Sequence, residues 1–213
     1  MKLVGVQALV IPDIATVKFA RFSDNRGYFT ETFRQSDFDG PQTPFLNGVR
    51  WMQANESFSR RGVVRGLHFQ WNPYMGKLIR TIRGHMVDVV LDIRKGSPTF
   101  GKIIGHDMPA HDRDVAGEWI WVPPGFAHGN TFIEDTTIEY FCSGEYSPGC
   151  EAGISPLAAD LDWSLCDPAL RDAFLANARD AGLMTDKDRN GFTLGDWAAD
   201  SRSDNFIYGA MGS

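Results

Sequence analysis

The sequence contains few cysteines, no long apolar run and no excess of basic residues. Its three cysteines are odd in number and are not spaced like metal ligands, so we expect free thiols in a reducing compartment. No run of 18 apolar residues occurs, so no membrane-spanning helix is expected. The opening MKLVGVQALVIPD lacks a basic stretch followed by an apolar one, which argues against a signal peptide. These absences predict a cytoplasmic protein without a membrane partner.

The balance of charge is acidic, with a net charge of −6 and a pI near 5.3. Binding along nucleic-acid phosphates needs a basic face, so no nucleic-acid partner is expected. A few placed arginines and lysines can still hold one nucleotide diphosphate on an acidic protein. Hydrophobic residues make up 43% and charged residues 23% of the chain, which is ordinary for a globular protein.

The chain is organised as short strands up to about residue 155 and as a different segment from 156 to 213. The whole length, 1–213, is expected to form a single domain with a β-barrel first and a C-terminal helix and tail packed on it. Many short strands with no helical segments between them favour an antiparallel sandwich or barrel, an all-β fold. Gly84-His85 is expected to close a tight hairpin between two of these strands. The clearest strand candidates are Val63–Gln70, Lys77–Arg83, Met86–Ile93, Trp119–Val122 and Thr136–Cys142.

One amphipathic helix is expected after the strands. Asp167-Pro168 places an N-cap residue before a proline at the first helical position. Leu170, Phe174 and Ala178 recur on one face, and Gly182 is expected to cap the C-terminus. The polar, glycine-bearing tail from 196 to 213 is expected to lie over the surface or fray.

Polar residues that could carry chemistry gather in four segments. Arg65 and His68, within RGLHFQ, are separated by an odd number and would face opposite sides of a flat strand. Gly66 between them could host a bulge that brings both inside a barrel. Buried polar groups must be satisfied, so this concentration of them in an apolar strand favours a site. The other three segments are DNRGYFTE at 24–31, PPGFAHG at 123–129, and Glu139-Tyr140 with Tyr146 and Glu151.

A metal site is not expected, although Pro123-Pro124-Gly125-Phe126-Ala127-His128 resembles part of the second cupin motif. A metal cupin commonly supplies His-x-His in its first motif, where this chain has His68-Phe69-Gln70. His68 and His128 alone fall short of a facial set of ligands.

Taken together, the segments resemble the dTDP-4-dehydrorhamnose 3,5-epimerases over about residues 20 to 194. This resemblance implies a cupin-type jelly-roll barrel, a homodimer, a nucleotide-diphosphate sugar as substrate, and no metal or organic cofactor. The matching stretches are DNRGYFTETF, VVRGLHFQ, GKLIRTIRGHMVDVVLDIRKGSPTFG, WVPPGFAHG, YFCSGEYSPGCEAG and DKDRNGFTL.

The resemblance also implies roles for single residues. His68 corresponds to the base, Tyr140 to the acid on the opposite face, and Asp188 to the carboxylate that pairs with the base. Lys77 and Arg65 would surround the sugar ketone and the pyrophosphate. Tyr146 corresponds to the aromatic residue that stacks on the nucleotide base. Further substrate-binding positions are Arg26, Glu31, Gln53, Asn55, His128, Glu151 and Lys187.

These roles suit the removal of a proton next to a ketone. The enolate that forms needs preorganised cations at its oxygen, an imidazole is a suitable base, and inversion needs a second group across the ring. The chain departs from the family pattern at Ala54, at 71–75 and at Asn130-Thr131. These departures leave the identity of the sugar and of the nucleotide undetermined. The alternatives are an epimerase of C3 or C5 only, a 3,4-ketoisomerase, a non-catalytic sugar-binding module and a metal-dependent cupin oxygenase.

Overall fold

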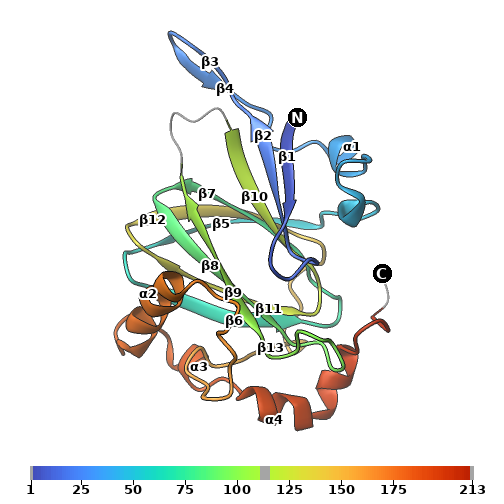
Figure 1. Ribbon diagram of the computed structural model, residues 1–213, viewed down its shortest axis with the longest axis vertical. Helices are drawn as coiled ribbons and strands as arrows, with labels where there is room; N and C mark the ends of the chain where they lie inside the picture. Colours follow the sequence, from blue (N-terminus) through green and yellow to red (C-terminus); the bar gives the residue numbers. More distant parts are fainter. Residues whose placement is uncertain (1, 111–115, 212–213) are drawn as a thin grey trace.

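Two antiparallel sheets face each other in the computed structural model, which describes residues 2–110 and 116–211 (Figure 1). The first sheet has six strands in the order β1-β2-β10-β7-β12-β5: Leu3–Ala8, Ala15–Ala20, Ala116–Val122, Lys77–Arg83, Thr136–Cys142 and Gln53–Ser59. The second has five in the order β13-β6-β11-β8-β9: Glu151–Gly153, Val64–Gln70, Phe126–Phe132, His85–Asp92 and Ile103–Pro109. The all-β class predicted from the sequence is confirmed.

Strand β8, inside the five-stranded sheet, shows why this sequence forms a sheet covered on both faces. Its residues HMVDVVLD include five apolar ones, and all but His85 are buried. Met86 and Val90 point between the two sheets, where they join one hydrophobic cluster. Val87 and Val89 point the other way, into a cluster shared with the C-terminal helices. Successive side chains of a strand face opposite sides, so a strand buried on both needs apolar residues throughout.

Short helices and 3₁₀ turns cover the outer face of each sheet. The segment with helix α1 (Gln35–Phe38) and the 3₁₀ turn η1 (Pro44–Leu46) covers the six-stranded sheet and packs on its tryptophans. The five-stranded sheet is covered by α2 (Pro168–Arg179), α3 (Asp186–Arg189), α4 (Leu194–Ala199) and the 3₁₀ turn η2 (Ser201–Asn205). The cavity described below is lined by residues of both sheets and of α3.

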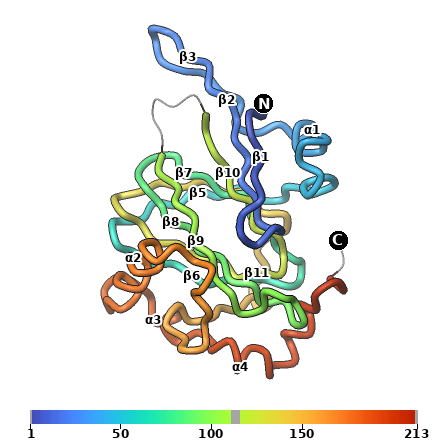
Figure 2. The backbone as a smooth tube through the Cα atoms, viewed as in Figure 1, coloured from blue at the N-terminus to red at the C-terminus, as the bar shows by residue number. Residues whose placement is uncertain are grey.

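A small hairpin projects from this body. Strands β3 (Phe22–Asp24) and β4 (Gly27–Phe29) pair only with each other and extend away from the sheets, at the end opposite α3 and α4 (Figure 2). Phe22 is 53% and Phe29 68% exposed. The DNRGYFTE segment therefore contains a tight turn followed by strand β4.

The predicted strands are found, but the predicted hairpin at Gly84-His85 is wrong. Strands β7 and β12 have the bounds expected from the sequence, and the other three expected strands differ by a few residues. Strand β7 pairs with β10 and β12, whereas β8 pairs with β11 and β9 in the other sheet. Gly84 has a φ of 87° and turns the chain from one sheet to the other, which a local turn signal cannot distinguish from a hairpin.

Helix α2 begins as predicted and ends earlier. The Asp167 side chain accepts a hydrogen bond from the Ala169 amide, and Phe174 and Ala178 are buried on one face. The C-cap is Asp180, so the expectation of a cap at Gly182 is wrong. The Gly182 amide instead donates to the side chain of Asp180, which ends the helix without a left-handed residue.

The C-terminal tail is more ordered than its polar composition suggests. Trp197 on α4 and Phe206 after η2 are 0% exposed and pack in the cluster behind the five-stranded sheet. The expectation of a tail that frays is therefore wrong for the described part, because these aromatic side chains anchor it. Within 2–110 and 116–211 no helix is long and apolar enough to cross a bilayer.

Candidate active site

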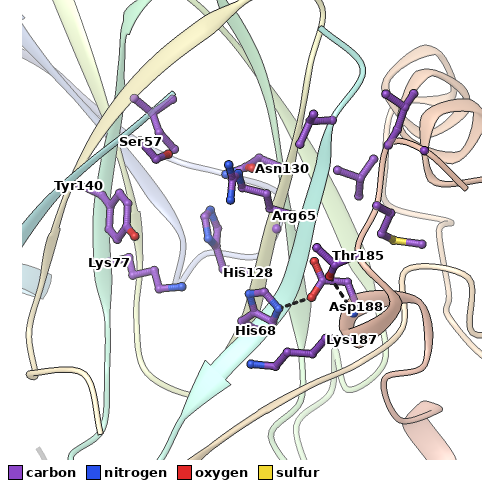
Figure 3. A pocket seen from close by; sticks show the side chains of 17 residues that line it. Ser57, Arg65, His68, Lys77, His128, Asn130, Tyr140, Thr185, Lys187 and Asp188 are labelled. Atoms are coloured by element: carbon purple, nitrogen blue, oxygen red, sulfur yellow. Dashed lines mark hydrogen bonds and ion pairs between the residues drawn. The ribbon is translucent and has the colours of Figure 1, made fainter. Parts of the chain in front are cut away.

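A cavity of about 570 Å³ opens between the two sheets and α3. Polar side chains from both sheets reach it, and apolar ones close part of its wall. Figure 3 shows Tyr140 and Lys77 on one side and His68 with Asp188 on the other. The lining residues are Ser57, Val63, Val64, Arg65, His68, Lys77, His128, Gly129, Asn130, Ile138, Tyr140, Gly182, Leu183, Met184, Thr185, Lys187 and Asp188.

His68 and Asp188 form a histidine–carboxylate pair across 120 residues of sequence. His68 Nε2 lies 2.7 Å from Asp188 Oδ1, and the Gly66 amide donates to Asp188 Oδ2 at 3.3 Å. Burial by itself raises the pKa of Asp188, but the hydrogen bonds from His68, Gly66 and Thr185 outweigh it and the net pKa is lowered. A carboxylate only accepts, so His68 Nε2 carries the hydrogen of this contact, and in the neutral imidazole Nδ1 is the nitrogen with the lone pair.

A β-bulge places Arg65 and His68 in the same cavity. Along the β6–β11 pair, His68 faces His128 while Arg65 faces Asn130, so two residues of β6 stand opposite one of β11. Gly66, with a φ of 112°, lies in this bulge, and a Cβ there would meet the Gly129 Cα at 2.5 Å. The prediction that Gly66 brings both side chains inside is confirmed. Arg65 is held by its Nε, which donates to Ser59 Oγ at 2.9 Å.

A second histidine–carboxylate pair lies deeper in the five-stranded sheet. His128 Nε2 lies 2.7 Å from Asp88 Oδ2, and Asp88 is 0% exposed. The two residues come from the adjacent strands β11 and β8. Asp88 is a functional candidate that was not expected from the sequence, although a carboxylate in the middle of the apolar run MVDVV was the available signal.

Lys77 is a half-buried cation with no hydrogen bond or ion pair to any residue of the described chain. Burial lowers the pKa of Lys77, and the negative potential of Cys142, Asp88 and Glu151 opposes that shift. An ammonium without a partner, at the wall of a cavity, is available to an anion that enters. The site can therefore stabilise negative charge on a bound molecule.

Tyr140 faces this group from the six-stranded sheet. Burial raises the pKa of the Tyr140 phenol, with a smaller opposing effect from Arg65. The phenol thus stays protonated at neutral pH and can donate a hydrogen bond or a proton. Tyr140 on β12 and His68 on β6 belong to different sheets and line the same cavity, so a ring bound between them has one on each face.

A second hollow of about 260 Å³ adjoins the cavity and shares His68, Lys77 and Tyr140 with it. Four further predicted residues line it: Gln53, Asn55, Tyr146 and Glu151. The Tyr146 hydroxyl donates to Glu151 Oε1 at 3.1 Å, and Lys187 Nζ reaches the same oxygen at 2.9 Å. Tyr146 is 54% exposed, so its ring remains accessible to a planar ligand.

Arg26 and Glu31 lie apart from both hollows. Arg26 is at the tip of the β3–β4 hairpin and pairs with Asp24 at 2.7 Å, and Glu31 contacts Arg34. Neither residue lines the cavity of its own chain. Their predicted role in substrate binding stays a prediction.

The other predicted site residues are brought together. Ser57, Thr185 and Cys142 also line the two hollows and were not expected from the sequence. Thr185 accepts a hydrogen bond from the Asp188 amide as the N-cap of α3, and a Thr-x-x-Asp pattern at 185–188 was the signal for it. Within the described ranges no group of three or more His, Cys, Asp or Glu residues could hold a metal ion, and the sequence-based expectation of no metal stays a prediction.

Comparison with known proteins agrees with this geometry. Residues 8–196 match the family model described as dTDP-4-dehydrorhamnose 3,5-epimerase. The chain belongs to this family. The dTDP-4-dehydrorhamnose 3,5-epimerase of Shigella flexneri is 39% identical over 76% of this chain and 88% of its own length. A dTDP-4-dehydrorhamnose 3-epimerase of Streptomyces niveus is also 39% identical, over 76% of this chain and 79% of its own length.

A solved structure of the family extends the agreement to the fold. The 3,5-epimerase of Legionella pneumophila, in complex with dTDP-4-keto-L-rhamnose, matches with a TM-score of 0.72 and 29% identity. The match covers 90% of this chain and 93% of the Legionella protein. The predicted cupin-type jelly roll is thereby confirmed, as is the prediction that this chain is an isomerase of the epimerase class.

Proposed function

We propose that the chain inverts C3, C5 or both in a nucleotide-linked 4-keto-6-deoxy sugar, dTDP-4-keto-6-deoxyglucose or a close relative. The observation that carries this proposal is the placement of His68 and Tyr140 in one cavity, on opposite sheets, with Lys77 between the two hollows. Several relatives are named for this reaction, and the Legionella structure holds a dTDP-linked keto sugar.

The proposed reaction begins with the transfer of a proton from carbon to His68 Nδ1. The electron pair of the broken C–H bond moves towards the ketone and leaves an enolate oxygen. The unpartnered ammonium of Lys77 stabilises this oxygen. Asp188, kept ionised by its hydrogen bonds, stabilises the imidazolium that forms.

The second half of the reaction returns a proton from the other face. The Tyr140 hydroxyl donates its proton to the carbon as the C–H bond forms again, and the ketone is restored. The raised pKa of the phenol keeps that proton available until the enolate exists. The phenolate is then reprotonated and the imidazolium deprotonated by solvent, so that each turnover returns the enzyme to its starting state.

Solvent exchange tests the reaction directly. The purified chain is incubated in D₂O with dTDP-4-keto-6-deoxyglucose, and NMR follows deuterium at C3 and C5. Deuterium at either carbon is expected. The absence of exchange with this sugar and with other nucleotide-linked 4-keto sugars would sink the proposal.

The number of inverted centres is the point on which relatives differ, since the Streptomyces niveus protein is named as a 3-epimerase. A C3-only reaction is the second candidate. Product NMR separates it from the double inversion, and also from a ketoisomerase, whose product carries the ketone at C3 rather than C4.

We also propose that the protein acts as a homodimer in which the β3–β4 hairpin reaches the cavity of the other copy. Arg26 and Glu31 match substrate-binding positions of the family but lie outside their own chain's cavity, on or after a projecting hairpin with exposed aromatic residues. Insertion of the hairpin into the other copy would bury those aromatic residues and bring Arg26 to the diphosphate of the bound substrate. We place the protein in the cytoplasm, where its free cysteines stay reduced.

Mixing two inactive variants tests this arrangement. In a dimer of Arg26→Ala with His68→Ala, one cavity combines an intact His68 with an intact Arg26 from the other copy. Activity is expected to recover to about a quarter of wild type, since half of the dimers are mixed and each has one complete site. No recovery, or a monomer by light scattering, would contradict the proposal.

A further inference from the structure

Asn130 is a buried amide in the wall of the main cavity. It lies on β11 two residues after His128, so both side chains face the same way, as Figure 3 shows. It is 4% exposed. Its neighbours in the cavity wall include Val63, Val64 and Ile138, which offer no hydrogen bonds.

The carboxamide of Asn130 makes no hydrogen bond within the described chain. Its Oδ1 is buried and has no donor, and its amide group donates to no described residue. Nearly all buried polar groups in folded proteins are paired, so an unpaired one needs a reason. A functional group kept for a ligand is one such reason.

The strand neighbours do not supply the missing partner. Asn130 is paired with Asp88 on β8 and with Arg65 on β6. Asp88 Oδ1 is itself buried without a donor, so of the two ends of the Asn130 carboxamide only the NH2 can bond to it. Arg65 is directed to Ser59 Oγ and the Phe58 carbonyl. In either orientation of the carboxamide, its oxygen finds no donor on these strands, and that donor must come from outside them.

We propose that Asn130 is a specificity-determining residue whose carboxamide hydrogen-bonds a hydroxyl group of the bound sugar. This rests on the proposed function, because it takes the occupant of the cavity to be a nucleotide sugar. A hydroxyl both donates and accepts, which suits an amide. A site built around such a bond rejects the analogue that lacks the hydroxyl, because the buried amide is then left unpaired.

Binding to stable nucleotide sugars tests the proposal without turnover. Calorimetry measures the Kd of dTDP-6-deoxyglucose and of its 2-deoxy and 3-deoxy analogues for wild type, Asn130→Leu and Asn130→Ala. We expect one of the two analogues to bind wild type about tenfold more weakly than dTDP-6-deoxyglucose, and this gap to disappear in both variants. Which analogue shows the gap identifies the hydroxyl.

A second readout separates this role from a structural one. Asn130→Leu removes an unpaired polar group at nearly constant volume, so its Tm is expected to equal or exceed that of wild type. Asn177→Leu is the matched control, since Asn177 Nδ2 donates to Thr131 Oγ1 at 2.9 Å. That variant is expected to lower the Tm and to keep the binding gap.

The outcomes are distinct. A gap that persists in both Asn130 variants, or the absence of any gap in wild type, overturns the role of Asn130 while leaving the epimerase function intact. If no nucleotide sugar binds and no solvent exchange occurs, the proposed function fails, and the role of Asn130 fails with it.

Discussion

Two histidine–carboxylate pairs with the same 2.7 Å separation lie in very different parts of the five-stranded sheet. His68 is on β6, near the edge, and its carboxylate comes from helix α3 outside the sheet. His128 is on the central strand β11, and its carboxylate comes from the neighbouring strand. The His68–Asp188 contact thus links the sheet to helix α3, whereas the His128–Asp88 contact lies within the sheet.

This difference fits the proposed roles of the two histidines, a base at His68 and an orienting group at His128. The His68 side chain is 34% exposed, whereas that of His128 is 8% exposed. A base must meet both the substrate and the solvent that resets it, which suits His68. His128, closed in by the sheet, is better suited to orienting a ligand through the nitrogen that Asp88 leaves free.

The largest expected effect distinguishes the two histidines directly. His68→Asn is expected to lower kcat/KM by about 10³ or more, because it removes the proton acceptor. His128→Asn removes a ligand contact and should lower kcat/KM by about tenfold, mostly through KM. Steady-state kinetics and solvent exchange measure the activity of each variant. Equal losses of kcat/KM would mean that the different burial of the two histidines does not reflect different roles.

Lys77→Met is expected to lower kcat by about 10² to 10³, because the enolate loses its cation. The same variant should raise the Tm at neutral pH, since burial disfavours the charged lysine. The pKa of Lys77 is lowered below its ordinary 10.5, so this penalty on wild type is present at low pH and fades as the pH rises towards that value. Wild-type kcat should also fall as the pH rises through the lowered pKa. A Tm gain that is independent of pH would contradict the burial argument.

Asp188→Asn is expected to lower kcat/KM by about 10 to 10², because His68 loses the group that fixes its tautomer. The lowered pKa of Asp188 means that its carboxylate stabilises the fold above the ordinary pKa of 3.8, and that this contribution is lost as the pH falls through the folded-state pKa. The Tm difference between wild type and Asp188→Asn should therefore be present at pH 7 and shrink below about pH 4.

The smallest effect is expected for the other carboxylate. Asp88→Asn keeps an oxygen for His128 and supplies a donor beside the unpaired Asn130 Oδ1. Activity should fall by less than about fivefold, and the Tm should not fall. If Asp88→Asn impairs the enzyme as much as Asp188→Asn, the two pairs have equivalent roles and the distinction drawn from their burial is wrong.

The interior of the sheets could be predicted because it depends on local pattern. Lys77–Arg83 and Thr136–Cys142 are strands with the bounds expected from the sequence, since their alternation and their turn residues are local properties. The same holds for the Gly66 bulge, because only glycine fits where β6 and β11 approach so closely. The segments that resemble the epimerase family likewise named most of the residues that line the two hollows.

The errors have a common physical cause, which is packing between elements far apart in sequence. Gly84 carries the turn signal of a hairpin, yet β7 and β8 enter different sheets because each finds better partners there. The tail is polar on average, but Trp197 and Phe206 fill space behind the five-stranded sheet and fix it. A turn signal and a mean composition contain no information about such partners.

The sequence by itself determined that the chain is all-β and which residue types could remove and return a proton, since these follow from periodicity and from the pKa ranges of side chains. The resemblance to the epimerase family implied that Asp188 pairs with His68, but only the tertiary structure decided the 2.7 Å contact between them, and that Asp88 Oδ1 and Asn130 Oδ1 would be buried without donors. Burial and distance set those properties, and both arise only when the sheets and α3 pack around one cavity.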